Sequence, residues 1–278
     1  MAKRRRMRWD RVFAVFGPLL LLIILICVCC NRDSTIEAGS SQTENVAVQT
    51  ATSDESVPVM TELTGDAVPA QAKPNHLTVV IDPGHGGKDG GAQDDDQHPT
   101  RFEKDDNLRL GLAVRDAFAQ YPDVTVILTR ETDEFIELEE RCRIANDAKA
   151  DFFISLHRNS SQSGNGVEIW INNSSNGENL WDKWLADYIK EWLEDVGVSN
   201  SRGVKFGFRA SESNTEGNNY YVNRFTNMPS CLIEMGFMTS EADNNNFDNR
   251  LNAYAEAIAM AVHELATDKG LLLSDAAQ

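Results

Sequence analysis

Short apolar runs alternate with longer amphipathic segments over the C-terminal two-thirds of the chain. The apolar runs predict strands at 76–82, 124–129, 151–157, 166–171 and 230–236. Apolar residues at helical spacing (i, i+3, i+4, i+7) predict helices at 106–118, 181–196 and 251–265. Alternation of this kind predicts an α/β domain of three layers, in which a largely parallel central sheet is flanked by helices.

A different pattern marks the N-terminus. Residues 12–30 are uncharged and almost wholly apolar, and a helix needs about 20 such residues to cross a membrane. The preceding segment, 1–11, is rich in Arg and Lys. The positive-inside rule therefore predicts one N-terminal transmembrane helix, with 1–11 in the cytoplasm and the rest of the chain outside.

Two alternatives to this anchor stay open. The first is a cleaved signal peptide, which would release the protein by secretion, although the nearest small-residue cleavage site, Ala38-Gly39-Ser40, lies far behind the apolar core. The second is lipidation at Cys27, Cys29 or Cys30, although the residues before these cysteines fit a lipoprotein signal poorly.

The sequence also predicts domain limits. Residues 31–75 are rich in Ser, Thr, Ala, Glu and Asp and lack a sustained period, which predicts a disordered extracytoplasmic linker. The folded domain is predicted at 76–268 and a short tail at 269–278.

Charge narrows the choice of partners. The chain has 26 basic and 43 acidic side chains, and residues 1–32 hold seven of the basic ones but only one acid. The rest is therefore strongly acidic and would repel a phosphate backbone, so nucleic acid is not an expected partner. Beyond the apolar run only Cys142 and Cys231 remain, which is too few for a disulfide framework.

Candidate chemistry lies near the ends of the predicted strands. His85 follows an apolar run in the turn Asp82-Pro83-Gly84-His85, and His157 ends another run. Glu234 lies within an apolar strand, where a carboxylate needs a cation, a metal or a proton as partner. Glu103, just ahead of a predicted helix, occupies a position that suits an anion. Because ligands of open α/β sheets bind at the carboxyl ends of strands, these groups are candidates for one site.

Two histidines and a carboxylate are a known ligand set for catalytic zinc, with the fourth position left to water. Zinc lowers the pKa of such a water to about 7 and polarises a carbonyl, and a further glutamate can shuttle the proton. The helical His-Glu-x-x-His motif of thermolysin-like proteases is absent. Histidines at strand ends are also often structural, so the pattern by itself leaves both interpretations open. His76, His98 and His263 are weaker candidates.

Four segments resemble the signature motifs of the zinc-dependent N-acetylmuramoyl-L-alanine amidases of the type 3 family. They are VIDPGHGGKD at 80–89, EKDDNL at 103–108, FISLH at 153–157 and LIEMGF at 232–237. They occur in the family's order, and the resemblance covers about residues 76–266. Taken together, the four motifs are highly specific.

The resemblance implies that His85, Glu103 and His157 bind zinc and that Glu234 is the catalytic residue. It implies hydrolysis of the amide bond between N-acetylmuramic acid and L-alanine in peptidoglycan, outside the cytoplasmic membrane. That location agrees with the orientation predicted from charge. A zinc peptidase that cuts within the stem peptide and a non-catalytic wall-binding module are the alternatives.

Three features depart from the family pattern. The loop at 93–102 is longer and more acidic than expected, Arg158 stands where the family usually has a small residue, and 206–219 is a polar insertion. We expect all three at the rim of the site, away from the four motif residues.

Overall fold

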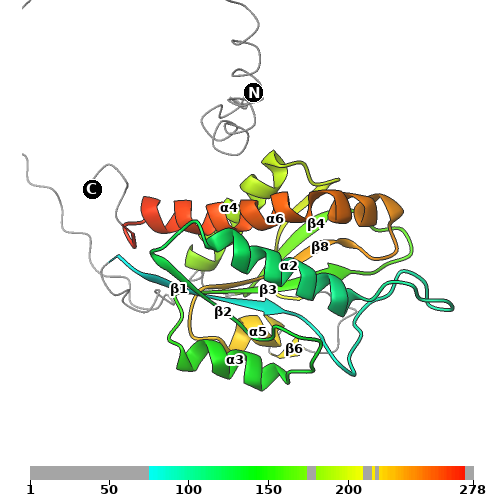
Figure 1. Ribbon diagram of the computed structural model, residues 1–278, viewed down its shortest axis with the longest axis horizontal. Coiled ribbons are helices and arrows are strands. Elements are labelled where there is room, and N and C mark those ends of the chain that lie inside the picture. The colour runs from blue at the N-terminus through cyan, green and yellow to red at the C-terminus, as the bar shows by residue number, and fades with distance from the viewer. Residues whose placement is uncertain (1–74, 174–179, 209–214, 217–218, 273–278) are drawn as a thin grey trace, which may run out of the picture. The chain divides into compact units, whose positions relative to one another are not determined.

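A six-stranded sheet with helices on both faces forms the core of the computed structural model, which describes residues 75–173, 180–208, 215–216 and 219–272 (Figure 1). The sheet strands are β1 (Leu77–Pro83), β2 (Val124–Leu128), β3 (Phe152–Asn159), β4 (Val167–Ile171), β5 (Ser201–Phe206) and β8 (Ser230–Phe237). The helices are α2 (Glu103–Phe118), α3 (Leu138–Asp147), α4 (Leu180–Asp195), α5 (Tyr221–Phe225) and α6 (Glu241–Asp268). A separate small pair joins β6 (Thr215–Glu216) to β7 (Asn219–Tyr220).

The strand order is β2-β1-β3-β8-β4-β5. All neighbouring strands are parallel except β8 and β4, which run antiparallel. Helices α2, α4 and α6 pack together on one face of the sheet, and α3 and α5 lie on the other (Figure 1). The predicted α/β domain of three layers with a largely parallel sheet is therefore confirmed.

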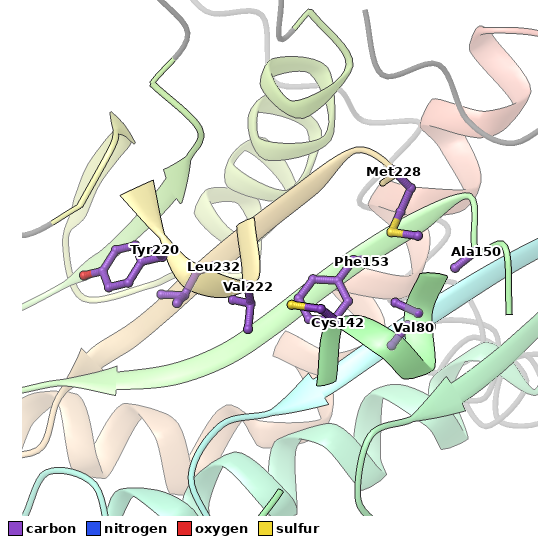
Figure 2. Packing of buried hydrophobic residues seen from close by; sticks show 9 residues of the cluster. Val80, Cys142, Ala150, Phe153, Tyr220, Val222, Met228 and Leu232 are labelled. Atoms are coloured by element: carbon purple, nitrogen blue, oxygen red, sulfur yellow. The ribbon is translucent and has the colours of Figure 1, made fainter. Parts of the chain in front are cut away.

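Strand alternation distributes the core between the two faces. Val80, Phe153 and Leu232, from three neighbouring strands, are buried on the face that α3 and α5 cover. Figure 2 shows them beside Cys142 of α3 and Val222 of α5. Because side chains alternate along a strand, every second residue from these three points to the same side of the sheet. That periodicity fixes which polar residues reach the site.

The predicted helix at 251–265 was wrong at its start, because α6 begins ten residues earlier, at Glu241. The side chain of Ser240 accepts a hydrogen bond from the Asp243 amide, and acids occupy the first turn, both of which favour a helix start. Two helices and one sheet strand, α3, α5 and β5, were not predicted.

Within the described ranges, no helix is both long enough and apolar enough to cross a membrane. The cytoplasmic segment 1–11, the predicted membrane helix at 12–30, the linker up to residue 74 and the last residues of the tail, 273–278, lie outside the described residues. These predictions therefore stay predictions.

Candidate metal centre and active site

Strands β1, β3 and β8 change from apolar to polar residues toward their C-terminal ends on the face that α3 covers. In β1, Val80 is followed on this side by Asp82. In β3 the alternate residues Phe153, Ser155 and His157 point to this side, because strand side chains repeat every two residues. In β8, Leu232 and Glu234 do the same. The ladder pairs His157 directly with Glu234. The two side chains therefore start from the same face of the sheet at the same level.

His85 lies on the turn that follows β1. Its backbone has a φ of 60°, which is uncommon for a residue other than glycine and tends to occur at functional sites. Gly84 is required by close approach, because a Cβ on it would lie 2.3 Å from Cε1 and Nε2 of His157. The glycine thus allows the two histidine-bearing segments to come together.

Two buried arginines hold this turn by its carbonyl groups. Arg130 donates to the carbonyls of Pro83 (2.8 Å) and Gly84 (2.9 Å). Arg141 donates to the carbonyls of Pro83 (2.9 Å) and His85 (2.7 Å), and forms an ion pair with buried Asp82 (2.6 Å). Hydrogen bonds from charged donors are stronger than neutral ones, so the arginines can offset the strain at His85.

His85, Glu103 and His157 come together at this edge of the sheet. His85 Nε2 lies 3.2 Å from Glu103 Oε2, and His157 Nδ1 lies 2.9 Å from Glu103 Oε1. The imidazole rings are edge to face, with centroids 4.9 Å apart. One donor atom from each residue lies within 4.8 Å of the others, a spacing that could hold a metal ion. The structure thus assembles three side chains that are 18 or more positions apart in sequence.

The Glu103 carboxylate is buried and fixed by hydrogen bonds. Backbone amides of Ala92 (2.8 Å) and Arg158 (2.9 Å) donate to its two oxygens, and Asn107 Nδ2 lies 3.3 Å from Oε1. Burial alone would raise the pKa of Glu103, but the charges of His85 and His157 and their hydrogen bonds to the carboxylate outweigh it and hold the pKa well below its usual range. Glu103 is therefore an anion that presents its oxygens to the histidines.

Asp89 orients His85 from the side away from Glu103. Its Oδ2 lies 2.8 Å from His85 Nδ1, which leaves Nε2 directed at the cluster. Burial lowers the pKa of His85, but the carboxylates of Glu103 and Asp89 outweigh it and raise the pKa to about 10. A strong preference for positive charge at this point is what a cation site requires.

All four predicted site residues line one cavity of about 520 Å³. Glu234 is only 6% exposed and faces this cavity from β8. The opposite wall is largely apolar and comes from the segment before α3, from α3 itself and from the β7–α5 corner: Phe135, Ile136, Leu138, Tyr220, Tyr221 and Val222. The cavity therefore combines a cation-seeking cluster, a separate buried carboxylate and an apolar wall.

Sequence reasoning missed several supporting residues. Asp89 and Asp82 lie inside a recognised motif, but nothing in their spacing revealed contacts with His85 and Arg141. The expectation that Arg158 lies at the rim was wrong. Its side chain is fully buried behind the site, and its backbone amide contacts Glu103.

Comparison with known proteins agrees with the motifs. The family described as N-acetylmuramoyl-L-alanine amidase (Amidase_3) matches residues 79–264. The Bacillus subtilis protein YqiI, described as uncharacterized, is 36% identical over 167 residues, which are 60% of this chain and 72% of YqiI. The N-acetylmuramoyl-L-alanine amidase LytC of B. subtilis is 32% identical over 192 residues, which cover 67% of this chain and 34% of LytC.

The fold agrees as well. The catalytic domain of CwlV, an N-acetylmuramoyl-L-alanine amidase from Bacillus (Paenibacillus) polymyxa var. colistinus, superposes with a TM-score of 0.58 at 32% identity, over 68% of this chain and 97% of that domain. The family match spans most of the folded domain and includes the four predicted site residues that line the cavity. The chain belongs to the N-acetylmuramoyl-L-alanine amidase family.

Proposed function

We propose that this protein is a zinc-dependent N-acetylmuramoyl-L-alanine amidase that cleaves the amide bond between N-acetylmuramic acid and L-alanine in peptidoglycan. One observation carries the proposal. Two imidazoles and a buried carboxylate converge within 4.8 Å of one another, and a second acid, Glu234, lines the same cavity from a separate strand. Family membership supplies the substrate class.

The residues present fit zinc. His85 Nε2, His157 Nδ1 and a Glu103 oxygen are nitrogen and oxygen donors of the kind that zinc prefers, and three protein ligands leave a position open for chemistry. Asp89 and the amides of Ala92 and Arg158 fix the donors from outside, as outer partners of metal ligands commonly do. Bound zinc would supply a Lewis acid for the scissile carbonyl and a more acidic water.

Glu234 would carry the proton. A carboxylate near the reacting water can take its proton as the water attacks the carbonyl carbon, and then give that proton to the leaving nitrogen of L-alanine. The C–N bond breaks, and a carboxylate and an amine are the products. The position of Glu234 directly across the ladder from His157 supports this role, because it places the acid beside the proposed metal ligands without making it one of them.

The apolar wall would receive the groups around the scissile bond. Both the lactyl ether of N-acetylmuramic acid and L-alanine present a methyl group, and apolar side chains such as Ile136, Leu138 and Val222 offer matching surface. Part of the wall, Leu138 and Val222, also packs in or against the buried cluster under α3 and α5.

For location, we propose a single-pass anchor at 12–30, a spacer at 31–75 and a catalytic domain at 76–268 outside the cytoplasmic membrane. The apolar run behind a basic N-terminus supports this arrangement. Protease treatment of intact cells would test it, because an external domain is degraded and a cytoplasmic one is protected.

Product analysis tests the activity. The full-length protein in detergent is incubated with defined muropeptides, with a chelator, and with the chelator followed by zinc. We expect release of stem peptides with a free L-alanine amino group, loss of release with chelator, and its return with zinc. Fragments cut within the stem peptide would instead establish a peptidase, and no zinc-dependent cleavage at all would remove the proposal.

A further inference from the structure

We propose that Arg158 is a positioning residue for the metal centre, which holds the end of β3 against α2 and α6 so that Glu103 and His157 keep a fixed separation. The inference rests on the proposed function, since it assumes that these two residues bind zinc. The family resemblance does not suggest it, because the resemblance leads one to expect a small residue at this position.

The side chain of Arg158 lies behind the site. Since strand side chains alternate, His157 points to the cavity and Arg158 to the opposite face, toward α2 and α6. There its guanidinium forms a fully buried ion pair with Asp106 of α2 and donates to Asn244 Oδ1 of α6 (2.6 Å). Its Cζ lies 4.4 Å from the centre of the Phe247 ring, which adds a cation–π contact.

The ion pair and the proposed ligand pair join the same two elements. Asp106 lies one turn after Glu103 on α2, and Arg158 directly follows His157 on β3. The backbone amide of Arg158 also donates to Glu103 Oε1 at 2.9 Å. Any shift between α2 and β3 that the ion pair prevents would therefore change the position of Glu103 relative to His157.

A local irregularity in the sheet makes such an anchor useful. The β3–β8 ladder shifts register between His157 and Asn159, and on β8 the shift falls between Glu234 and Phe237, a stretch that includes Gly236 with a φ of 87°. Irregularities of this kind weaken local pairing. Arg158 Nε lies 3.4 Å from the Gly236 carbonyl oxygen, so the arginine contacts the strand at the point where regular pairing stops.

Stability alone explains this arginine poorly. A buried ion pair is often no more stabilising than apolar residues of similar size, because both charges must be taken out of water. Asp106 also accepts from Arg101 (2.7 Å) and Arg109 (3.1 Å). Removal of Arg158 would therefore leave Asp106 with two cationic partners, and the main loss would be the link between α2, β3 and α6.

Zinc affinity of the full-length protein, measured by competition with a chromophoric chelator, tests the inference. We expect Arg158→Met, which keeps an unbranched stem but not the charge or the fork of donors, to weaken zinc binding by about 10- to 100-fold, as loss of outer-shell partners does. Arg158→Lys should recover part of the loss, because it keeps the charge but makes fewer of the contacts. Arg250→Met is the control, the same substitution at an exposed arginine that donates to the Val196 carbonyl just after α4. The zinc affinity of this variant should equal that of the unmodified protein.

The outcomes separate this inference from the proposed function. If the unmodified protein binds zinc and Arg158→Met binds it equally well, Arg158 is only structural and the inference fails alone. If the unmodified protein binds no zinc, both fail. Should Arg158→Met not fold, Asn244→Ala provides the answer, because it removes one partner of the guanidinium and leaves the ion pair. It should weaken zinc binding less than Arg158→Met is expected to, and unchanged affinity in that variant would also overturn the inference.

Discussion

Glu234 and His157 are direct neighbours across the β3–β8 ladder, and both side chains project from the face of the sheet that α3 covers. The pairing brings a buried acid next to a proposed metal ligand, although the two residues are far apart in sequence. Because two adjacent strands, buried except at His157, fix it, the relation does not depend on loop conformation. It allows the roles of metal binding and proton transfer to be separated by experiment.

Glu234→Gln should abolish most of the activity and leave zinc binding intact. The amide keeps the size of the carboxylate but cannot accept the proton, and loss of a general base typically lowers the rate by about 10²- to 10⁴-fold. Stem-peptide release from purified cell walls measures the rate, and atomic absorption of the dialysed protein measures the zinc.

His157→Ala is the counterpart of that variant, since it should lose both activity and zinc. Should Glu234→Gln release stem peptides at the normal rate with its metal in place, Glu234 would not be the proton carrier. Parallel loss of zinc in both variants would instead make Glu234 a ligand.

Asp89→Ala should weaken zinc binding by about 10- to 100-fold, because outer partners set the tautomer and direction of metal-binding histidines. Asp89 lies 2.8 Å from Nδ1 of His85 and keeps Nε2 directed at the cluster. Competition with a chelator measures the affinity. Asp89→Asn, which retains an acceptor oxygen, should lose less. Equal affinity in Asp89→Ala and the unmodified protein would show that the turn orients His85 without help.

The residues of the site could be named from sequence because four motifs resemble the signatures of the family; the apolar pattern by itself marked them only as candidates. His85 was recognisable as a polar residue on the turn after an apolar run, His157 and Glu234 as polar residues at the end of or within such runs, and Glu103 as an acid ahead of a predicted helix. Most strands of the sheet could also be predicted, since its inner strands are nearly continuous apolar runs, as expected for strands covered on both faces.

The rest depends on contacts between distant residues or on weak local patterns. The Asp82–Arg141 pair spans 59 positions, and no local pattern signals it. Strand β5, with the sequence SRGVKF, lies at a sheet edge and has no buried residue, so it has no apolar run to detect. Helix α3 is short and half of its residues are charged. The first ten residues of α6 contain four asparagines, which are poor helix formers.

Asp82→Asn should destabilise the fold in a pH-dependent way. Burial raises the pKa of Asp82, but Arg141 and the hydroxyls of Thr129 and Ser155 outweigh it and hold the pKa below its usual value of 3.8. A depressed pKa means that the ionised form stabilises the folded state above pH 3.8 and that this contribution is lost as the pH falls through the folded-state value. The variant leaves Arg141 buried without its counter-charge, and breaking such a pair costs about 3–5 kcal/mol.

Urea unfolding at pH 7 and at pH 3 measures this difference. The free energy of unfolding should differ most between Asp82→Asn and the unmodified protein at pH 7, and the gap should narrow at pH 3. Asp116→Asn, on the exposed end of α2, is the control and should change little at either pH. A gap that is constant with pH would mean that the charge of Asp82 does not matter to the fold.

The acidic loop at 93–102 is a second departure from the family pattern, and Asp94 organises it; most of the third, the insertion at 206–219, lies outside the described residues. Its Oδ1 accepts from the backbone amides of Thr100 (2.9 Å) and Arg101 (3.0 Å), so one side chain closes the loop. Hydrogen bonds from the Thr100 hydroxyl and from these amides lower the pKa of Asp94 to about 2. Asp94 therefore has a structural use, and the loop should stay closed at neutral pH.

Asp94→Ala should open the loop without disturbing the metal centre. The Gln93–Phe102 bridge, the Ala92 contact with Glu103 and the Arg101 ion pairs lie at the base of the loop and remain in the variant. We therefore expect faster proteolytic cleavage between residues 95 and 100, read by mass spectrometry, with unchanged zinc affinity. Asp96→Ala, at the exposed tip, should be cleaved at the unmodified rate. If Asp94→Ala lost zinc as well, the loop would be part of the support for Glu103, and its length and charge would bear directly on the metal site.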